Sequence, residues 1–180
     1  VCHDTTIYLN GSGQYVIDSS YVHIAAQSAC GIKSVTLSKY IFNCSDTGSN
    51  TVTVVATDNN GNISTCQAIV TVIDNQLPNV LCQNINLYLN HMGAASIDSS
   101  DIDNGSSDNC SIAMLSLDVT TFNCSDIGTN TVTLTGTDSS GNMASATAVV
   151  TVVDDLAPVA DAMDITVMLD VNGEASITVG

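Results

Sequence analysis

Residues 121–142 read TFNCSDIGTNTVTLTGTDSSGN, and this stretch decides the fold of the chain. Every second residue of 131–137 is threonine, and the apolar residues Val132 and Leu134 stand between them. A period of two residues predicts a β-strand with one face in a core and the other in water. The following DSSGN, at 138–142, has the composition of a tight turn into a further strand.

The same stretch occurs 80 residues earlier, where residues 41–62 read IFNCSDTGSNTVTVVATDNNGN without insertion or deletion. A repeat of this length corresponds to a whole small domain. We therefore predict one repeat over 1–80 and a second over 81–160. Residues 161–180 match the start of the same pattern, so they are expected to form the first two strands of a third repeat.

Strand signals dominate each copy, and no stretch has a convincing helical period. Seven short strands are predicted in the first copy, near 4–10, 14–18, 21–25, 32–38, 41–44, 50–57 and 63–73. This pattern predicts an all-β fold of tandem immunoglobulin-like antiparallel β-sandwich repeats. The short links around Pro78 and Pro158 favour a stiff array, so the copies should form a rod.

The composition limits the partners and the compartment. The net charge is −16, from 17 aspartates and Glu174 against Lys33 and Lys39 alone. Such a surface repels nucleic acid, which needs a basic face. No apolar run is long enough to cross a bilayer, so no membrane insertion is expected in this segment. Seven cysteines without a CxxC pair indicate an oxidising, extracellular location.

Two of the expected disulfides are internal to the copies. If each predicted strand crosses the sandwich, the loops at 26–30 and 45–49 share its C-terminal end. We therefore predict the bridges Cys30–Cys44 and Cys110–Cys124. Each closes a loop of about 14 residues, which the chain-entropy model values at roughly 3 kcal/mol.

A third bridge has two candidate pairings. Cys2 opens the first predicted strand and Cys66 opens the last, so the bridge Cys2–Cys66 would clasp the sandwich and leave Cys82 as a free thiol opposite Ala146. The alternative is Cys66–Cys82 across the junction. We prefer the clasp, because the Cα atoms of a disulfide must come within about 7 Å.

Two groups of aspartates are candidate calcium sites, since calcium takes six to eight oxygen ligands from loops. The first group is the loop at 98–109, with Asp98, Asp101, Asp103 and Asp108. The simpler interpretation is a solvated loop whose carboxylates cap turns.

The second candidate lies at the junction, where Asp74 approaches the loops of the second copy that hold Asp98, Asp101 and Asp138. The simpler interpretation of Asp138 is a cap on its own hairpin, like Asp58 in the first copy. No other cofactor is indicated.

No catalytic motif is present. The chain has no GxSxG, HExxH or glycine-rich phosphate loop, and its three histidines occupy positions that do not repeat. A carbohydrate-binding module would need exposed aromatic side chains, but tryptophan is absent. The chain is therefore predicted not to be an enzyme.

The repeated residues resemble a known family. These are Asp108-Asn109-Cys110, Phe122 to Asp126, Thr137-Asp138, Gly141-Asn142 and Val150 to Asp154. They resemble the hyalin repeat, and more closely the tandem immunoglobulin-fold repeats of large Bacteroidota cell-surface adhesins, including the gliding-motility adhesin type. The resemblance implies extracellular exposure and a role in cell adhesion, with an unknown surface ligand.

Two functions are compatible with these features. The first is a non-catalytic rigid stalk or adhesive array, whose partners are further repeats of the same chain. The second is a self-polymerising filament subunit, in which the hairpin 161–180 completes a neighbouring copy by strand addition. A polypeptide that ended near Gly180 would favour the second function.

Overall fold

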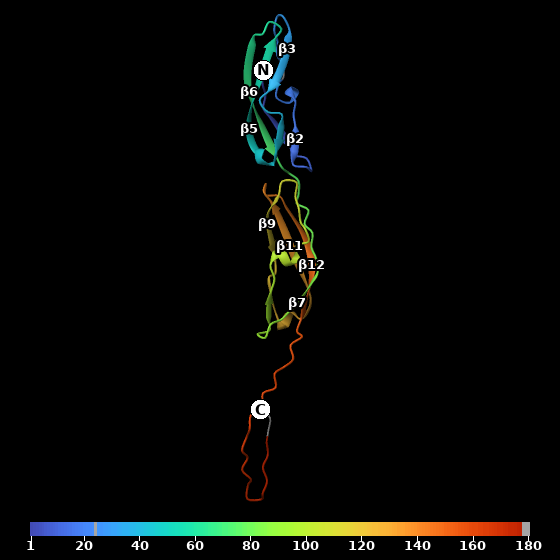
Figure 1. The fold of residues 1–180 in the computed structure, drawn as a ribbon, viewed down its shortest axis with the longest axis vertical. Helices are drawn as coiled ribbons and strands as arrows, with labels where there is room; N and C mark the ends of the chain where they lie inside the picture. Colours follow the sequence, from blue (N-terminus) through green and yellow to red (C-terminus); the bar gives the residue numbers. More distant parts are fainter. Residues whose placement is uncertain (24, 178–180) are drawn as a thin grey trace.

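The computed structural model describes residues 1–23 and 25–177, which form two β-sandwiches placed end to end and a C-terminal extension (Figure 1). The elements of the first sandwich are β1 (Thr5–Tyr8), β2 (Gln14–Val16), η1 (Ser19–Tyr21), β3 (Ile32–Leu37), β4 (Ile41–Asn43), η2 (Cys44–Asp46), β5 (Gly48–Asp58) and β6 (Ile63–Ile73). Those of the second are β7 (Ile85–Tyr88), β8 (Ala94–Ser96), α1 (Ser99–Ile102), β9 (Ile112–Leu117), β10 (Thr121–Asn123), η3 (Cys124–Asp126), β11 (Gly128–Asp138) and β12 (Met143–Val153).

Both sandwiches have the same topology, and the immunoglobulin-like fold expected from the sequence is confirmed. The larger sheet has the order β1-β6-β5-β3 in the first copy and β7-β12-β11-β9 in the second. The smaller sheet pairs β2 with β4, and β8 with β10. The edge strands β1 and β7 run parallel to their partners β6 and β12, whereas the other pairs are antiparallel.

The core lies between the two sheets. Val52 and Val54 on β5 are buried while Thr51 and Thr53 face outward, which is the alternation expected from the sequence. Phe42 on β4 covers this face from the opposite sheet and is fully buried. Val132, Leu134 and Phe122 occupy the equivalent core positions in the second copy.

The prediction of a strand at 21–25 was wrong, and the error reversed the position of one loop. The chain runs in a single direction from β2 through η1 to His23, which pairs with Cys2 near the N-terminal end of the sandwich. Asp18 caps η1 instead of starting a reversal. The loop at 26–30 therefore lies at the N-terminal end, where Asn59 N donates to Gly31 O.

The C-terminal extension begins like a third copy. It leads away from the second sandwich and folds back on itself (Figure 1). Asp170 N donates to Glu174 O at 2.8 Å, and Gly173 N donates to Asp170 O at 3.0 Å. Asn10, Gln14 and Gly13 make the same two bonds in the first copy. No part of 161–177 is paired in a sheet, so Ile165 and Leu169, which match core positions, remain exposed.

Candidate functional site at the domain boundary

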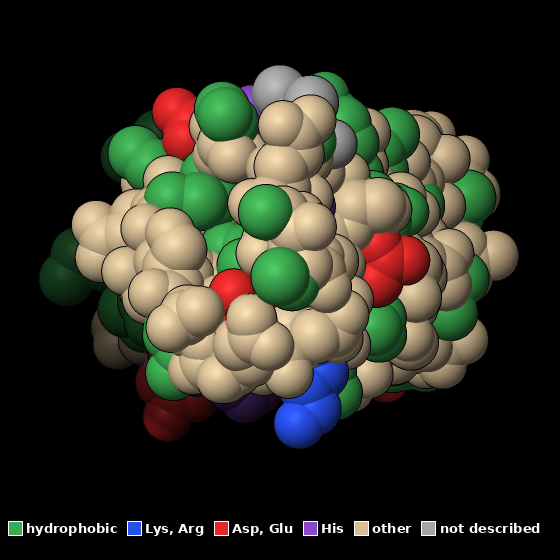
Figure 2. Space-filling view, turned by 90° about the horizontal axis from the view of Figure 1, so that it is seen from above, with side chains coloured by type: hydrophobic (Ala, Val, Ile, Leu, Met, Phe, Trp, Pro, Cys, Tyr) green, Lys and Arg blue, Asp and Glu red, His purple; other side chains and the backbone are tan. Residues whose placement is uncertain are grey.

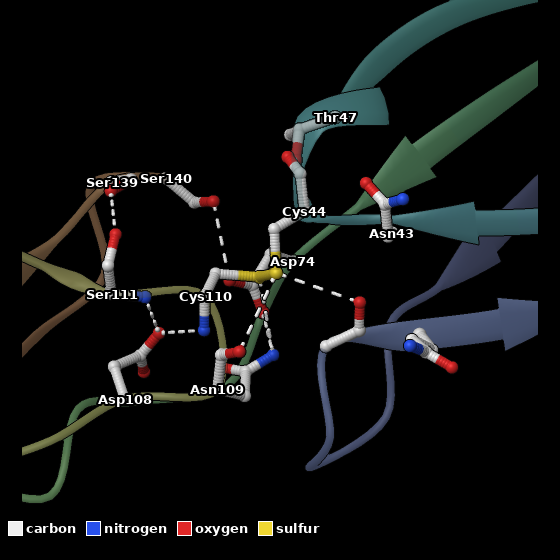
Figure 3. The surroundings of a disulfide bond; sticks show 12 residues. Asn43, Cys44, Thr47, Asp74, Asp108, Asn109, Cys110, Ser111, Ser139 and Ser140 are labelled. Atoms are coloured by element: carbon white, nitrogen blue, oxygen red, sulfur yellow. Dashed lines mark hydrogen bonds between the residues drawn. A yellow bond between two sulfur atoms is a disulfide. The ribbon is translucent and has the colours of Figure 1, made fainter.

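A disulfide joins the two sandwiches. Cys44 at the start of η2 is bonded to Cys110, with their Cα atoms 5.3 Å apart (Figure 3). The predicted bridges Cys30–Cys44 and Cys110–Cys124 are therefore wrong. Cys30 and Cys44 lie at opposite ends of the first sandwich, as do Cys110 and Cys124 in the second, so neither pair can meet.

The clasp within the first sandwich is confirmed. Cys2 is bonded to Cys66 with a Cα separation of 6.0 Å, and Cys82 is free. The alternative pairing of Cys66 with Cys82 is thereby excluded. In the chain-entropy model a loop closed over 64 residues contributes about 4 kcal/mol, a large share of the stability of a small domain.

Local hydrogen bonds hold both halves of the interdomain bridge in place. Asn43 and Asp46 form a capping box around η2, which fixes Cys44 at its first residue. On the other side, Asp108 Oδ2 accepts hydrogen bonds from the backbone nitrogens of Cys110 at 2.8 Å and Ser111 at 3.2 Å. The sulfurs are thus presented by two pre-formed turns (Figure 3).

Three carboxylates meet beside this disulfide. Asp74 of the link and Asp108 and Asp138 of the second sandwich each place one ligand oxygen within 4.8 Å of the others. Asp74 is 4 % exposed and Asp138 is 2 % exposed. Three or more side chains of Asp, Glu, His or Cys this close together could hold a metal ion. In the described residues, these three aspartates are the one such group.

The cluster also connects the sandwiches by hydrogen bonds. Asn109 Nδ2 donates to Asn10 O and to Asp74 Oδ1, both at 3.2 Å. Asn142 Nδ2 donates to Asp74 O at 3.1 Å, and Ser140 Oγ donates to Asp74 Oδ2 at 3.4 Å. Asp74 is therefore enclosed by two loops of the second copy.

Among the described residues, no lysine pairs with the three carboxylates. Both lysines of the chain lie in the first copy, where Lys39 pairs with Asp46 and Lys33 is exposed on β3. Figure 2 views the end of the first sandwich opposite this boundary from above, where acidic side chains and a lysine are visible on the surface. Two buried oxygens at the boundary, Asp108 Oδ1 and Asn109 Oδ1, accept no hydrogen bond from the described residues. Buried carboxylates without a counter-charge are costly, so the site suits a cation with oxygen ligands.

The other three aspartates of the predicted calcium loop serve the local fold. Asp98 and Asp101 form a capping box on α1, and Asp103 Oδ1 accepts from Ser106 N at 2.9 Å. Hydrogen bonds from Ser100 lower the pKa of Asp98, and those from Ser106 lower the pKa of Asp103. The simpler interpretation holds for these residues, and only Asp108 joins the junction cluster.

Asp138 serves both the hairpin and the boundary. Its Oδ1 accepts from Ser140 N and Asn142 N, and its Oδ2 accepts from Asn142 Nδ2, all at 2.8 Å. Burial raises the pKa of Asp138, but these hydrogen bonds outweigh burial and hold the pKa below its ordinary value. The predicted meeting of Asp74 and Asp138 is found in the structure, while Asp108 was assigned from sequence only to the neighbouring loop.

Comparisons with known proteins identify no family. No protein-family model matches the chain, and no curated protein matches it. Among solved structures, extracellular cadherin domains 1–4 of protocadherin gamma B7 match 86 % of the chain at 12 % identity and a TM-score of 0.37, and the chain spans half of that structure.

Two further structures are similar to the chain. Human mucin-like protocadherin EC1-2 matches 85 % of the chain and 96 % of its own length, at 10 % identity and a TM-score of 0.38. The Clostridium thermocellum CbhA fibronectin(III)-like modules match 91 % of the chain and 96 % of their own length, at 10 % identity and a TM-score of 0.31. Scores this low carry no conclusion about function. Within the described residues, no helix has the length and apolar character to span a membrane.

Proposed function

We propose that the chain is a non-catalytic segment of an extracellular adhesin, in which stacked repeats act as a rigid stalk. The observation that carries this proposal is the domain boundary, where the Cys44–Cys110 bridge and the buried Asp74 cluster lock successive sandwiches together. A flexible linker would not need such a covalent connection. The disulfides also require an oxidising compartment, which supports a location outside the cell.

The resemblance of the repeated motifs supports a more specific assignment. We assign the segment to a cell-surface adhesin of the Bacteroidota gliding-motility type, and its direct partners are neighbouring repeats of the same chain. Its mechanism is mechanical, because a boundary held covalently transmits load without letting the repeats bend apart. Antibodies raised against the chain should label intact, non-permeabilised cells, and labelling only after permeabilisation would contradict the assignment.

The lock predicts a single extended shape in solution. X-ray scattering of the oxidised protein should give one maximum dimension that matches two sandwiches in line. Cys44→Ser should broaden the distribution of dimensions, whereas Cys124→Ser is the matched control because it alters the equivalent position without cutting the bridge. A broad distribution in the unaltered protein would refute a rigid stalk.

We further propose that the boundary binds calcium through Asp74, Asp108 and Asp138. The support is chemical. Among the described residues, three carboxylates within 4.8 Å of one another have no basic partner, and one of their own oxygens, Asp108 Oδ1, is buried and accepts no hydrogen bond. A hard divalent cation supplies the missing charge and takes these oxygens as ligands.

Calcium binding is tested with a substitution of Asp74 and with the same substitution at Asp154, the equivalent position of the second copy. Calcium should raise the melting temperature of the unaltered protein after EDTA treatment, and Asp74→Asn should abolish most of this rise. Asp154→Asn is the matched control. Asp154 accepts from Leu156 N at 3.1 Å, much as Asp74 accepts from Gln76 N at 3.2 Å, but it is exposed. An unchanged melting temperature at millimolar calcium would remove the metal site and leave the disulfide-locked stalk intact.

The second candidate function is a filament subunit, in which the third-copy segment pairs with another copy of the chain. Ile165, Val167 and Leu169 repeat the positions of Ile85, Leu87 and Leu89, which lie against the second core. A strand of another copy could cover them. Sedimentation of the 180-residue chain distinguishes the functions. Concentration-dependent polymers lost in Ile165→Asp would support a filament, and monomers at all concentrations would support the stalk.

A further inference from the structure

Two exposed cysteines occupy the positions of the two halves of the interdomain bridge. Cys124 stands in the second copy where Cys44 stands in the first, and Cys30 stands in the first copy where Cys110 stands in the second. Both are free and exposed. Within one copy the two positions lie at opposite ends of the sandwich, so each can bond only to a cysteine outside its own copy.

The surroundings of Cys124 reproduce those of Cys44. Each cysteine begins a 3-10 helix whose preceding asparagine forms a capping box, and the cap dihedral angles are −139° and −175° at Asn43 against −141° and −175° at Asn123. The sulfur of Cys44 lies 3.6 Å from Gly13 O, and that of Cys124 lies 3.7 Å from Gly93 O. The thiol is therefore presented in the bonding position before any partner arrives.

The surroundings of Cys30 reproduce those of Cys110 in outline. Ser28 Oγ accepts from Cys30 N at 3.4 Å, in the place where Asp108 accepts from Cys110 N. Asn59 N donates to Gly31 O at 3.2 Å, and Ser139 N donates to Ser111 O at the same distance. Both cysteines are thus held against the neighbouring hairpin by equivalent turns.

We propose that Cys124 and Cys30 are the two halves of further interdomain disulfides, each completed by a repeat of the same type that continues the array. This rests on the stalk proposed above. The third-copy segment 161–177 follows the second sandwich, so a sandwich completed there would bring its own Cys110 position to Cys124 (Figure 1). The array then carries a covalent bridge at every junction that has both cysteines.

The reaction is an oxidation that needs an external acceptor. Each new S–S bond forms from two thiols, with loss of two protons and two electrons. A disulfide oxidant, such as oxidised glutathione, accepts the two electrons and the two protons, and its own S–S bond is thereby cleaved to two thiols. The leaving sulfur belongs to the oxidant, so no atom of either repeat is lost other than the two thiol hydrogens.

The test uses the chain extended by a second copy of its own residues 101–160, which completes the third repeat begun at 161–180. After oxidation in a glutathione buffer and digestion at aspartates, mass spectrometry should find Cys124 linked to the added copy of Cys110. Cys44–Cys110 is the internal reference. Cys124→Ser should remove only the new link and leave one more alkylatable thiol on the added repeat.

Each outcome decides between the assignments. A Cys124 that remains alkylatable while scattering shows three sandwiches in line overturns the bridge and leaves the stalk standing. A third sandwich that does not stack contradicts the stalk as well. Multimers in which Cys124 of one chain is linked to Cys30 of another chain would refute a bridge to the next repeat of the same chain. They would support the filament subunit.

A second variant tests Cys30 without any added domain. Asp108→Ser with Asn109→Ala gives Cys110 the neighbours that precede Cys30, namely Ser28 and Ala29. The Cys44–Cys110 bridge should still form in most molecules, as judged by the mass shift after alkylation. Free thiols at both positions in an otherwise folded protein would show that the turn of Cys30 cannot accept a bridge.

Discussion

Val80 of the link packs over Gly136 on β11, and a methyl group added to Gly136 would come within 2.8 Å of Val80 Cγ2. The first copy has Ala56 at the same position of β5. Gly136 therefore makes room for the link that enters the second sandwich. Because the clash is with a side chain in a partly buried cluster, we expect Gly136→Ala to destabilise the protein by about 1 to 3 kcal/mol.

Chemical denaturation measures this effect. The double variant Gly136→Ala with Val80→Ala should recover most of the lost free energy of unfolding, since the added methyl group then takes the space of the removed one. Ala56→Gly is the matched change in the first copy and should cost only about 1 kcal/mol of strand stability. Additive effects of the two substitutions in the double variant would show that Val80 is not what Gly136 accommodates.

Gly13 is a second position where space at the boundary requires glycine. Its φ is +69°, and a Cβ there would come within 2.6 Å of Asn109 O and 2.7 Å of Cys44 Sγ. Gly13→Ala should therefore slow formation of the Cys44–Cys110 bridge, measured by the rate at which thiols disappear during oxidative refolding.

Gly93→Ala is the control for backbone strain. It has the same φ of +69° and a similar approach to Cys124 Sγ, but a Cβ added there would meet no other atom of the described residues within 4 Å. Both variants should lose about 1 to 2 kcal/mol from the left-handed conformation alone. Equal rates of bridge formation in the two variants would mean that the contact with Asn109 does not matter.

The three free cysteines should react at different rates with an alkylating reagent at pH 8. Cys30 and Cys124 are exposed, whereas Cys82 is partly buried against the second core. Burial raises the pKa of the Cys82 thiol above 9.0, and the negative charge of Asp103 adds to the effect. Because the thiolate is the reactive form, Cys82 should be labelled more slowly than the other two. Labelling of Cys82 at the rate of Cys124 would contradict this placement.

The long strands could be predicted from sequence because their own pattern determines them. β6 spans Ile63–Ile73, as expected, and β5 extends the predicted 50–57 by a few residues at its ends. Repetition added the domain organisation, because a pattern that recurs after 80 residues cannot be a chance alternation. The clasp Cys2–Cys66 followed from two neighbouring strands, because Cys2 lies shortly before β1 and Cys66 lies on β6.

The interdomain bridge could not be reached in this way, because its prediction depended on the direction of short elements. Asp18, Ser19 and Ser20 have turn composition, but Asp18 caps η1 and the two serines belong to η1, so the chain continues in one direction. One false reversal moved Cys30 to the wrong end of the sandwich. The repeat did contain information about the bridge. Because Cys30 and Cys44 recur as Cys110 and Cys124, the recurrence is equally compatible with a bridge inside each copy and with a bridge from Cys44 of one copy to Cys110 of the next.

Acid should weaken the protein in a way that depends on Asp138. Its pKa in the folded state lies below 3.8, its ordinary value, so the folded form binds this proton less readily than the unfolded form. The stabilisation is fully present above pH 5 and is lost as the pH falls through 3.8 and below the lowered folded value. Each such group contributes a slope of at most about 1.4 kcal/mol per pH unit.

Denaturation in EDTA between pH 6 and pH 2.5 measures this slope without bound metal. Asp138→Asn should be less stable than the unaltered protein at pH 6 but should lose less stability on acidification, since the titrating group is gone. Asp161→Asn in the exposed extension is the control and should follow the unaltered protein. Parallel curves for Asp138→Asn and the unaltered protein would mean that Asp138 has the same pKa in both states, and that its hydrogen bonds to Ser140 and Asn142 contribute nothing selective to the charged form.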